Sequence, residues 1–380
     1  MQHVLVAESN WRGHTLAYAA TVANLIHEVG VRVTLGIPEE NDLSLDYVRT
    51  AREMVDAGVE VLPCFEATEP GYLKPLKPTD QKVVETILRE QDRAGANRVL
   101  LPTADSLATM RRTNPALREL SRREPRSIIH QPRLGYGGYG HRFMVARERI
   151  RWRLKRCGHR LGMLDPLSHR SAVRSGMDVE LLNFSSRCRK SVDRVRARSL
   201  LGIPADARVI SALGEHSVRK GTLELIMAWP ETTPPGTILL VVGLLSDPIR
   251  EELQRRSEQV QRGAIIVRDE LVSDEVFQAG FAASDVVTAL YPRHHGISGI
   301  VQEAAHHERP VLGSQYGALG LFIKEGGLGE TLDARDPTAM KAGLQRIIER
   351  DPRVDTAKRA NYLESQNLER ARNQIHQWLS

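Results

Sequence analysis

A lysine followed directly by a glycine, Lys220-Gly221, lies where a strand-like run of the sequence gives way to a helix-like one. The β-branched run 208–213 precedes the pair, and a helical stretch begins at Thr222. A lysine ammonium and the N–H groups of a helix start are both positive, so together they can hold a diphosphate. Lys220-Gly221 is therefore a candidate anion site, although without further context a surface lysine at a helix start is the commoner case.

Gly13 occupies a comparable turn near the N-terminus. It belongs to the run Glu8-Ser-Asn-Trp-Arg-Gly-His14, between a strand-like segment and a helix expected from Thr15. A glycine in such a turn lets backbone amides approach a phosphate, but alone it is more often only a turn residue. The dinucleotide fingerprint Gly-x-Gly-x-x-Gly is absent, which argues against a nicotinamide-dependent enzyme.

His130 follows the strand-like segment 126–129 and precedes a run rich in glycine and tyrosine, residues 131–141. Ligands of open parallel sheets bind beyond the strand ends, so His130 lies where a site residue is sought, although a strand-end histidine is more often structural. The run after it has two interpretations, a lid over a ligand or a loop with no role.

A metal site is not expected. The pairs His294-His295 and His306-His307 lack the i, i+4 spacing and the carboxylate partners of a helical metal site. The cysteines are three in number and have no Cys-x-x-Cys spacing, so neither a disulfide framework nor a structural zinc is expected.

Short β-branched runs alternate with helix-length stretches along most of the chain, which predicts an α/β protein with doubly wound parallel sheets. A proline-rich connection is expected over residues 63–78, and the pattern weakens after His159. The pattern occurs twice, so 380 residues are expected to form two Rossmann-like domains. We expect an N-terminal domain over 1–185, a linker over 186–204, a second domain over 205–353 and a C-terminal helix over 354–380 that crosses back. Strands are expected at 3–7, 31–35, 59–62, 98–101, 126–129, 208–213, 237–242, 264–267, 285–290 and 310–312.

Positive charge is concentrated in one region. The chain has a net charge of +6, but residues 111–160 carry fifteen basic and three acidic residues, a net charge of +12. Arg147, Arg151 and Lys155 belong to an amphipathic stretch over 142–156, which either packs on its own domain or lies on an anionic membrane surface. A basic region attracts anionic partners. A nucleic-acid partner is not expected, because no recognition module accompanies the charge and aromatic residues make up 5%.

Composition and termini indicate the compartment. Hydrophobic residues make up 41% of the chain, and the longest apolar run, 237–245, is less than half of a bilayer crossing. The N-terminus does not resemble a signal peptide. We therefore expect a soluble cytoplasmic protein, with peripheral contact at the inner membrane surface left open.

The run from Tyr291 to Gly317 carries a resemblance. Glu303-Ala-Ala, then Pro310-Val-Leu, Ser314 and Gly317, resembles the donor-binding signature of glycosyltransferase family 4, the retaining enzymes of the two-domain GT-B fold. Lys220-Gly221 is similar to that family's phosphate-binding lysine. The resemblance covers residues 201–324, whereas the N-terminal half is similar in architecture alone.

The resemblance implies a role for several residues. Glu303 would bind the ribose of a nucleotide-sugar donor, Lys220 would neutralise its diphosphate, and the loop Ser314–Gly317 and the turn at Gly13 would approach sugar and diphosphate. When a glycosyl phosphate bond breaks, negative charge develops on the leaving diphosphate. A fixed positive charge of the protein beside the diphosphate therefore favours the reaction. No metal or other cofactor is then expected, and the family implies retention of anomeric configuration.

Two departures from the motif concern the chemistry. The family has an arginine where this chain has Glu215, and a glutamate where it has His295. We expect Arg219 or Arg293 to replace the missing guanidinium. The candidate catalytic residues are Lys220, His130 and His295, and Arg219 joins the donor-binding set.

The sequence therefore predicts a glycosyltransferase, of the hexosyltransferase type or a related one, with an anionic or lipid-linked acceptor bound near the basic stretch. Two alternatives remain. Ser298-Gly-Ile-Val-Gln-Glu303 is also similar to a stretch of the non-hydrolysing sugar-nucleotide 2-epimerases. Glu215 and His295 could instead mark a degenerate domain that binds or scaffolds without turnover.

Overall fold

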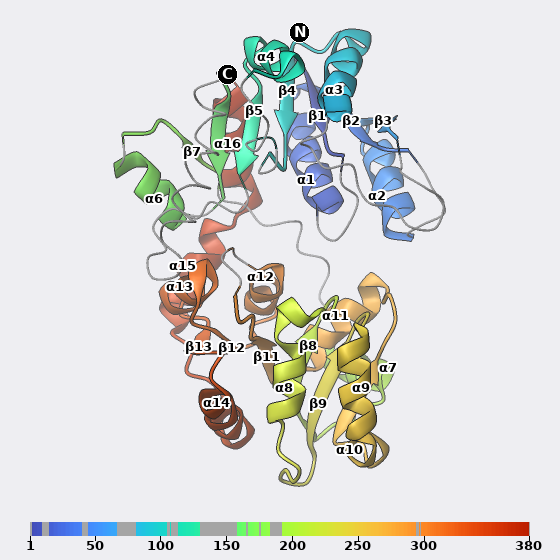
Figure 1. Ribbon diagram of the computed structural model, residues 1–380, viewed down its shortest axis with the longest axis vertical. Helices are drawn as coiled ribbons and strands as arrows, with labels where there is room; N and C mark the ends of the chain where they lie inside the picture. Colours follow the sequence, from blue (N-terminus) through green and yellow to red (C-terminus); the bar gives the residue numbers. More distant parts are fainter. Residues whose placement is uncertain are drawn as a thin grey trace. The chain divides into compact units, whose positions relative to one another are not determined.

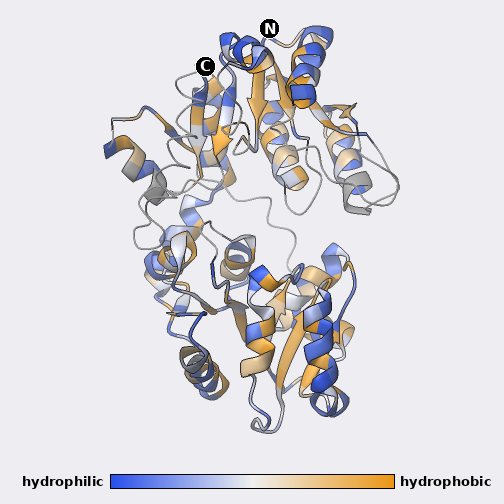
Figure 2. Ribbon diagram, viewed as in Figure 1, coloured by the Kyte–Doolittle hydropathy of each residue, from blue (hydrophilic) through white to orange (hydrophobic). Residues whose placement is uncertain are grey.

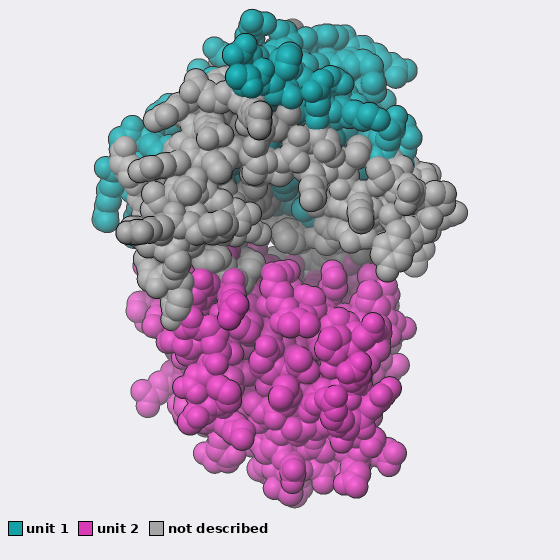
Figure 3. Space-filling model, in the orientation of Figure 1, with its two compact units in different colours: residues 1–187, 365–380 teal, residues 188–364 magenta. Residues whose placement is uncertain are grey.

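In the computed structural model the chain folds into two compact units, and it passes from one unit to the other twice (Figure 3). Unit 1 comprises residues 1–187 together with 365–380, and unit 2 comprises residues 188–364. The structure describes residues 2–9, 15–39, 45–66, 81–104, 107, 113–129, 158–164, 166–174, 176–182, 192–293, 296 and 298–379.

The described part of unit 1 forms a seven-stranded parallel sheet with the strand order β3-β2-β1-β4-β5-β6-β7. Its strands are β1 (His3–Ala7), β2 (Arg32–Pro38), β3 (Glu60–Phe65), β4 (Arg98–Leu101), β5 (Arg126–Ile129), β6 (Arg160–Met163) and β7 (Glu180–Leu181). Its helices are α1 (Thr15–Glu28), α2 (Leu45–Asp56), α3 (Gln81–Ala94), α4 (Pro115–Arg122), α6 (Pro166–Arg174) and α16 (Leu368–Leu379).

Strand β1, in the interior of this sheet, is buried on both faces. Every residue of β1 is buried, as expected for a parallel strand covered by helices on both sides. One apolar cluster joins α1 and α16 to one face of the sheet, and another joins α3 and α4 to the opposite face. In Figure 2 the strands of both units are mainly hydrophobic, whereas most helices contain both hydrophobic and hydrophilic residues.

The C-terminal helix α16 is anchored in unit 1 by a buried arginine. Arg126 of β5 has no exposed surface, and it donates hydrogen bonds from Nε to the Trp378 carbonyl (2.8 Å) and from Nη2 to the Leu379 carbonyl (3.4 Å). Burial lowers the pKa of Arg126 to about 10. Trp378 and Leu379 themselves belong to the apolar cluster around α1. The last turn of the chain thus packs against one of the first helices.

The described part of unit 2 forms a six-stranded parallel sheet with the strand order β10-β9-β8-β11-β12-β13. Its strands are β8 (Arg208–Leu213), β9 (Thr237–Val242), β10 (Ile265–Arg268), β11 (Val286–Ala289), β12 (Val311–Ser314) and β13 (Gly329–Leu332). Its helices are α7 (Arg194–Leu201), α8 (Thr222–Ala228), α9 (Asp247–Arg255), α10 (Ser257–Gln261), α11 (Asp274–Ala283), α12 (Gly299–His306), α13 (Gly317–Glu325), α14 (Pro337–Glu349) and α15 (Thr356–Ser365).

Helices cover both faces of the second sheet (Figure 1). Helices α8, α9 and α14 pack on one face around the buried Trp229, and α7, α11, α12 and α13 pack on the other around Phe281. Asp285 joins α7 to the sheet, because it accepts hydrogen bonds from the Val209 amide (2.8 Å) and from Arg198 (3.2 Å). Two doubly wound parallel sheets confirm the predicted fold class.

Four regions differ from the sequence prediction. Strand β13, at the edge of the second sheet, was not predicted. Strand β3 continues through Pro63 to Phe65, where a proline-rich connection was expected; β3 is an edge strand, and proline is tolerated at sheet edges. Beyond His159, where the pattern weakens, β6, α6 and β7 extend the first sheet. The expected C-terminal helix is two helices, α15 and α16. Within the described ranges, no helix combines the length and the apolar character that a membrane crossing requires.

Candidate functional site

The carboxyl ends of β8 and β11 are the place in unit 2 where a ligand is expected. The chain order runs outward in opposite directions from these two neighbouring strands, which makes them the topological switch point of the sheet. Ligands of open parallel sheets bind outside the carboxyl ends at such points. The segments that follow β8 and β11 contain Lys220 and Tyr291.

Lys220 lies at the end of a short 3-10 turn, Val218–Lys220, and Gly221 after it begins α8. Gly221 has φ +70°, and a Cβ added there would lie 1.8 Å from the Leu290 carbonyl oxygen. Only glycine therefore allows the turn to approach the end of β11 so closely. This close packing fixes the backbone that carries Lys220 against the neighbouring segment.

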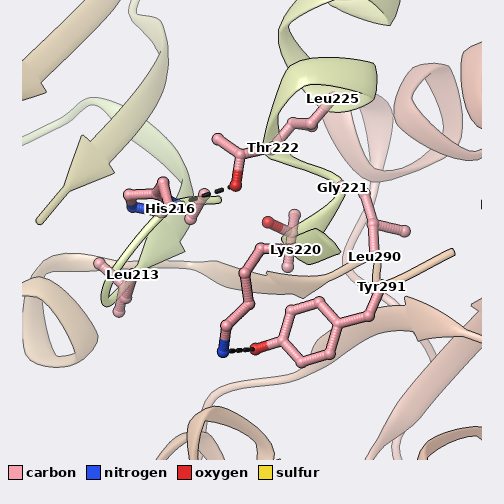
Figure 4. A pocket seen from close by; sticks show the side chains of 10 residues that line it. Leu213, His216, Lys220, Gly221, Thr222, Leu225, Leu290 and Tyr291 are labelled. Carbon is pink, nitrogen blue, oxygen red and sulfur yellow. Dashed lines mark hydrogen bonds between the residues drawn. The ribbon is translucent and has the colours of Figure 1, made fainter. Parts of the chain in front are cut away.

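The Lys220 side chain extends toward Tyr291 (Figure 4). Its Nζ lies 3.5 Å from the Tyr291 hydroxyl and 4.6 Å from the centre of the ring. The Tyr291 and Ser298 hydroxyls are 3.0 Å apart and both side chains are buried. Within the described residues no carboxylate forms an ion pair with Lys220, which leaves its charge available to an anion. The sequence analysis did not single out Tyr291 or this contact of Ser298, because both depend on β11 being the neighbour of β8.

His216 supports the same turn as a neutral group. Its Nδ1 lies 2.8 Å from the Thr222 hydroxyl and its Nε2 lies 3.1 Å from the Val242 carbonyl. Burial lowers the pKa of His216 to about 4, with the Lys220 charge as a smaller contribution. His216, Thr222, Lys220 and Tyr291 line a cavity of about 10 Å³, which is room for one water molecule. At neutral pH, Lys220 is the only cation among the residues that line this cavity.

Glu303 and Ser314 lie near the next two elements of unit 2. Glu303 is on α12, the helix that follows β11, and Ser314 is at the end of β12, the strand next to β11. Glu303 is half-buried and its Oε2 accepts a hydrogen bond from Gln278 Nε2 at 3.4 Å. Ser314 is 1% exposed, and its hydroxyl accepts a hydrogen bond from the Tyr316 amide. Gly317 is the first residue of α13. The Ser314 hydroxyl therefore stabilises the start of its own loop.

Arg219 and Lys220 line different cavities although they are adjacent in sequence. Arg219 borders a groove between α8 and α14, together with Arg293, and neither lines the cavity of Lys220. Glu215 is exposed in the segment between β8 and the Lys220 turn. The proposed replacement of the family arginine by Arg219 or Arg293 stays a prediction.

Two exposed leucines lie beyond the carboxyl ends of the next strands. Leu244 follows β9 and is 45% exposed, and Leu271 follows β10 and is 69% exposed. Asp269 stabilises the segment, because it accepts a hydrogen bond from the Leu245 amide at 2.9 Å. Arg250 lowers the pKa of Asp269 by its hydrogen bond. The sequence analysis missed both leucines, because their exposure appears only in the folded sheet.

Unit 1 has its own switch point, between β1 and β4. Glu8 follows β1 and is 1% exposed, and its Oε2 accepts a hydrogen bond from the Thr103 hydroxyl, after β4, at 2.5 Å. In the run 8–14 only Gly13 was predicted as a site residue, and no role was predicted for Glu8. A buried carboxylate at this place was not visible from spacing alone.

Several predicted site residues lie outside the described residues. They are Gly13, His130, His295, Arg147, Arg151 and Lys155. Their assignments stay predictions. Among the residues that the structure does describe, no group of three or more His, Cys, Asp or Glu side chains could hold a metal ion.

Comparisons with known proteins match this part of the chain to a family. Residues 207–350 match the model of the family described as "Glycosyl transferases group 1". A D-inositol 3-phosphate glycosyltransferase from a Nocardioides species is 27% identical over 175 residues, which cover 42% of this chain and 38% of that protein. The matched segment thus spans well under half of that relative's length.

Solved structures match the whole chain. The Anabaena protein HepE, in complex with UDP and glucose, has a TM-score of 0.67 at 15% identity, with 99% of both chains covered. Sucrose-phosphate synthase from Thermosynechococcus elongatus has a TM-score of 0.70 at 15% identity, covering 99% of this chain and 98% of the other. Residues 207–350 therefore match the glycosyl transferases group 1 family model, and the chain has the two-domain GT-B fold of these structures.

Proposed function

We propose that this protein is a glycosyltransferase that binds a nucleotide-sugar donor at the carboxyl ends of β8 and β11 and transfers the sugar to an acceptor. The observation that carries the proposal is Lys220, a cation at the switch point of a glycosyl transferases group 1 domain, beside neutral Tyr291 and neutral His216. The related fold of HepE was solved with UDP and with UDP-glucose, which supports a nucleotide-sugar as the donor class.

The chemistry proposed for Lys220 is electrostatic. Negative charge develops on the diphosphate as its bond to the sugar breaks, and a fixed ammonium stabilises that charge. Glu303 would accept hydrogen bonds from the ribose hydroxyls, and the exposed Leu244 and Leu271 would contact the base. The reaction would proceed without a metal, with retention of configuration as the family resemblance implies.

We further propose that the acceptor is anionic or lipid-linked and meets the basic region. Residues 111–160 carry the net charge of +12, and Arg147, Arg151 and Lys155 belong to it. A cytoplasmic protein that contacts the inner membrane surface would fit such an acceptor. Acceptor affinity should then fall as ionic strength rises, since salt screens exposed charges. An affinity independent of salt would contradict this acceptor class.

Donor binding is tested first with nucleoside diphosphates. A nucleotide at about a hundred times its dissociation constant should stabilise the folded state by about 2.7 kcal/mol, which a thermal unfolding scan detects. Lys220→Gln should weaken nucleoside diphosphate binding by about tenfold or more, because a charge-assisted hydrogen bond contributes about 1.5–3 kcal/mol. Lys324→Gln is the matched control, since Lys324 is an exposed lysine on α13.

Equal weakening in both variants, or no nucleotide binding at all, would refute the donor site. The alternatives are separated by products: an epimerase converts the nucleotide-sugar without an acceptor, whereas a transferase releases the nucleoside diphosphate. The exposed Glu215 is the observation that favours a degenerate domain. Binding without release across an acceptor panel would identify that case.

A further inference from the structure

Unit 2 contains a groove beside the Lys220 turn. It has a volume of about 680 Å³ and is lined by residues of α8, of the N-terminal part of α14 and of the segments that follow β11 and β13. Volumes of this size are typical of small-molecule sites. None of the residues that line the Lys220 cavity lines this groove.

The groove has an excess of positive charge. Arg219, Arg293, Arg335 and Lys341 line it, against a single carboxylate, Glu224. Arg335 is held in place by Asp333 (2.6 Å). Arg293 and Lys341 are exposed and form no ion pair with any described residue. An anion is therefore the charge class that the groove attracts.

Apolar side chains form the rest of its wall. Met227 and Val218 are 55% and 51% exposed, which is unusual for large apolar residues, and Pro292, Pro337 and the buried Met340 complete the lining. Exposed apolar surface beside concave polar groups is a mark of binding sites. A hydrated inorganic ion would leave this apolar surface uncovered, so the occupant needs an apolar body as well as a charge.

Glu224 adds an unsatisfied acceptor. Its Oε2 atom is buried and has no hydrogen-bond partner among the described residues. A buried acceptor without a partner costs about 1–3 kcal/mol. An N–H or O–H group of a ligand that reached Glu224 would remove that cost.

We propose that this groove is a second ligand site, for a small amphipathic anion: a phosphate ester with a flat apolar body and an N–H or O–H donor. Arg293 and Lys341 bind its phosphate, Met227 and Val218 contact its body, and Glu224 accepts from its donor. The site goes beyond the proposed donor function, because it uses neither Lys220 nor Glu303. It assigns Arg293, which lines the groove and not the Lys220 cavity, to this second ligand, and leaves Arg219 as the candidate to replace the family's arginine.

The two cavities share their walls. Val218 and Arg219 line the groove and Lys220 lines the small cavity, all within one three-residue turn. Leu290 and Tyr291 line the cavity, and Pro292 and Arg293 line the groove. Because Gly221 fixes this turn against Leu290, a ligand in the groove restrains the backbone that positions Lys220. Occupancy of the groove should therefore change nucleotide affinity without competing for the nucleotide site.

Binding of phenyl phosphate to the full chain tests the proposal, measured by calorimetry or ligand-observed NMR. We expect phenyl phosphate to bind more tightly than inorganic phosphate or benzyl alcohol, since each lacks one of its two parts. Arg293→Gln and Lys341→Gln should each weaken phenyl phosphate binding by about tenfold. The control Lys324→Gln lies on α13, on the opposite face of the sheet, and should bind as the native chain does.

The role of Glu224 as a hydrogen-bond acceptor is tested with 4-aminophenyl phosphate, whose amino group supplies N–H donors. It should bind more tightly than phenyl phosphate to the native chain, and the two should bind alike to Glu224→Leu. Equal loss in Lys324→Gln, equal affinity for inorganic phosphate, or an apparent dissociation constant for phenyl phosphate that rises in proportion to UDP concentration without reaching a plateau would each overturn the proposal. Failure of the donor function is seen separately, as absence of nucleotide binding in a chain that still binds phenyl phosphate.

Discussion

Substituting Gly221 by alanine should disrupt the turn that carries Lys220. An alanine at φ +70° costs about 1–2 kcal/mol for the left-handed backbone conformation. Its Cβ would lie 1.8 Å from the Leu290 carbonyl oxygen, whereas real contacts of this kind are longer than 3.0 Å, so one segment must move by more than 1 Å. Overpacking of that kind costs about 1–3 kcal/mol more. We expect a total destabilisation of about 3.5 kcal/mol.

Gly202 provides a matched control for the backbone contribution. It ends α7 with φ +68°, almost the same conformation, and an added Cβ would meet nothing within 4 Å. Gly202→Ala should therefore cost the conformational part alone, about 1.5 kcal/mol. The difference between the two variants isolates the collision with Leu290.

Calorimetry of the full chain measures both effects. For a unit of this size 1 kcal/mol corresponds to about 2–4 °C, so Gly202→Ala should lower the unfolding midpoint of unit 2 by roughly 4 °C and Gly221→Ala by roughly 10 °C. Gly221→Ala should also weaken nucleoside diphosphate binding, because Lys220 moves with the turn. Equal midpoints for the two variants would refute the close packing of the turn against β11.

Three further predictions concern the rest of the chain. Arg126→Met should destabilise unit 1 by about 2–4 kcal/mol and raise amide exchange in α16, because it removes the donors to the Trp378 and Leu379 carbonyls. The control Arg372→Met breaks only an exposed ion pair with Glu28 and should cost under about 1 kcal/mol. Asp285→Asn should destabilise unit 2 by about 3 kcal/mol in urea unfolding, because it leaves Arg194 and the buried Arg198 without their carboxylate, and an unchanged midpoint would contradict this. His216 has a pKa of about 4 in the folded state and about 6.5 in the unfolded state, so its contribution to stability is present above pH 6.5 and is lost as pH falls toward 4. The free energy of unfolding should therefore fall between pH 7 and pH 5, and His216→Asn should reduce that fall by about 2 kcal/mol. The same pH dependence in His216→Asn and the native chain would contradict a neutral buried His216.

The strands and helices were largely predictable because their apolar runs are long and regular. Strand β1 is apolar throughout, and its burial follows from that pattern. Strands β6 and β7 were missed because they are short, and they pair only with β5 and with each other at the far side of the sheet. Pro63 was taken as the start of a loop, since a sequence does not show which strand will lie at an edge.

The candidate site was predictable where it lies in one segment. Lys220-Gly221 was found from its position between a strand and a helix. The neighbours Tyr291 and Ser298 were not, because 71 residues separate Tyr291 from Lys220 and only the pairing of β8 with β11 brings them together. The separation of Arg219 from Lys220 was equally hidden, because two adjacent residues of a 3-10 turn point in different directions.

The return of the chain to unit 1 also affects how the protein folds during synthesis. Helix α16 supplies Trp378 and Leu379 to the same apolar cluster as α1, yet the whole of unit 2 is synthesised between them. At roughly 5–20 residues per second, the ribosome needs on the order of 10–40 s to translate unit 2, and throughout that time the α16 face of α1 has no partner. Unit 2, whose residues are continuous, can complete its core first. Unit 1 can complete its core only after α16 leaves the exit tunnel, so the first unit translated is the last to finish folding.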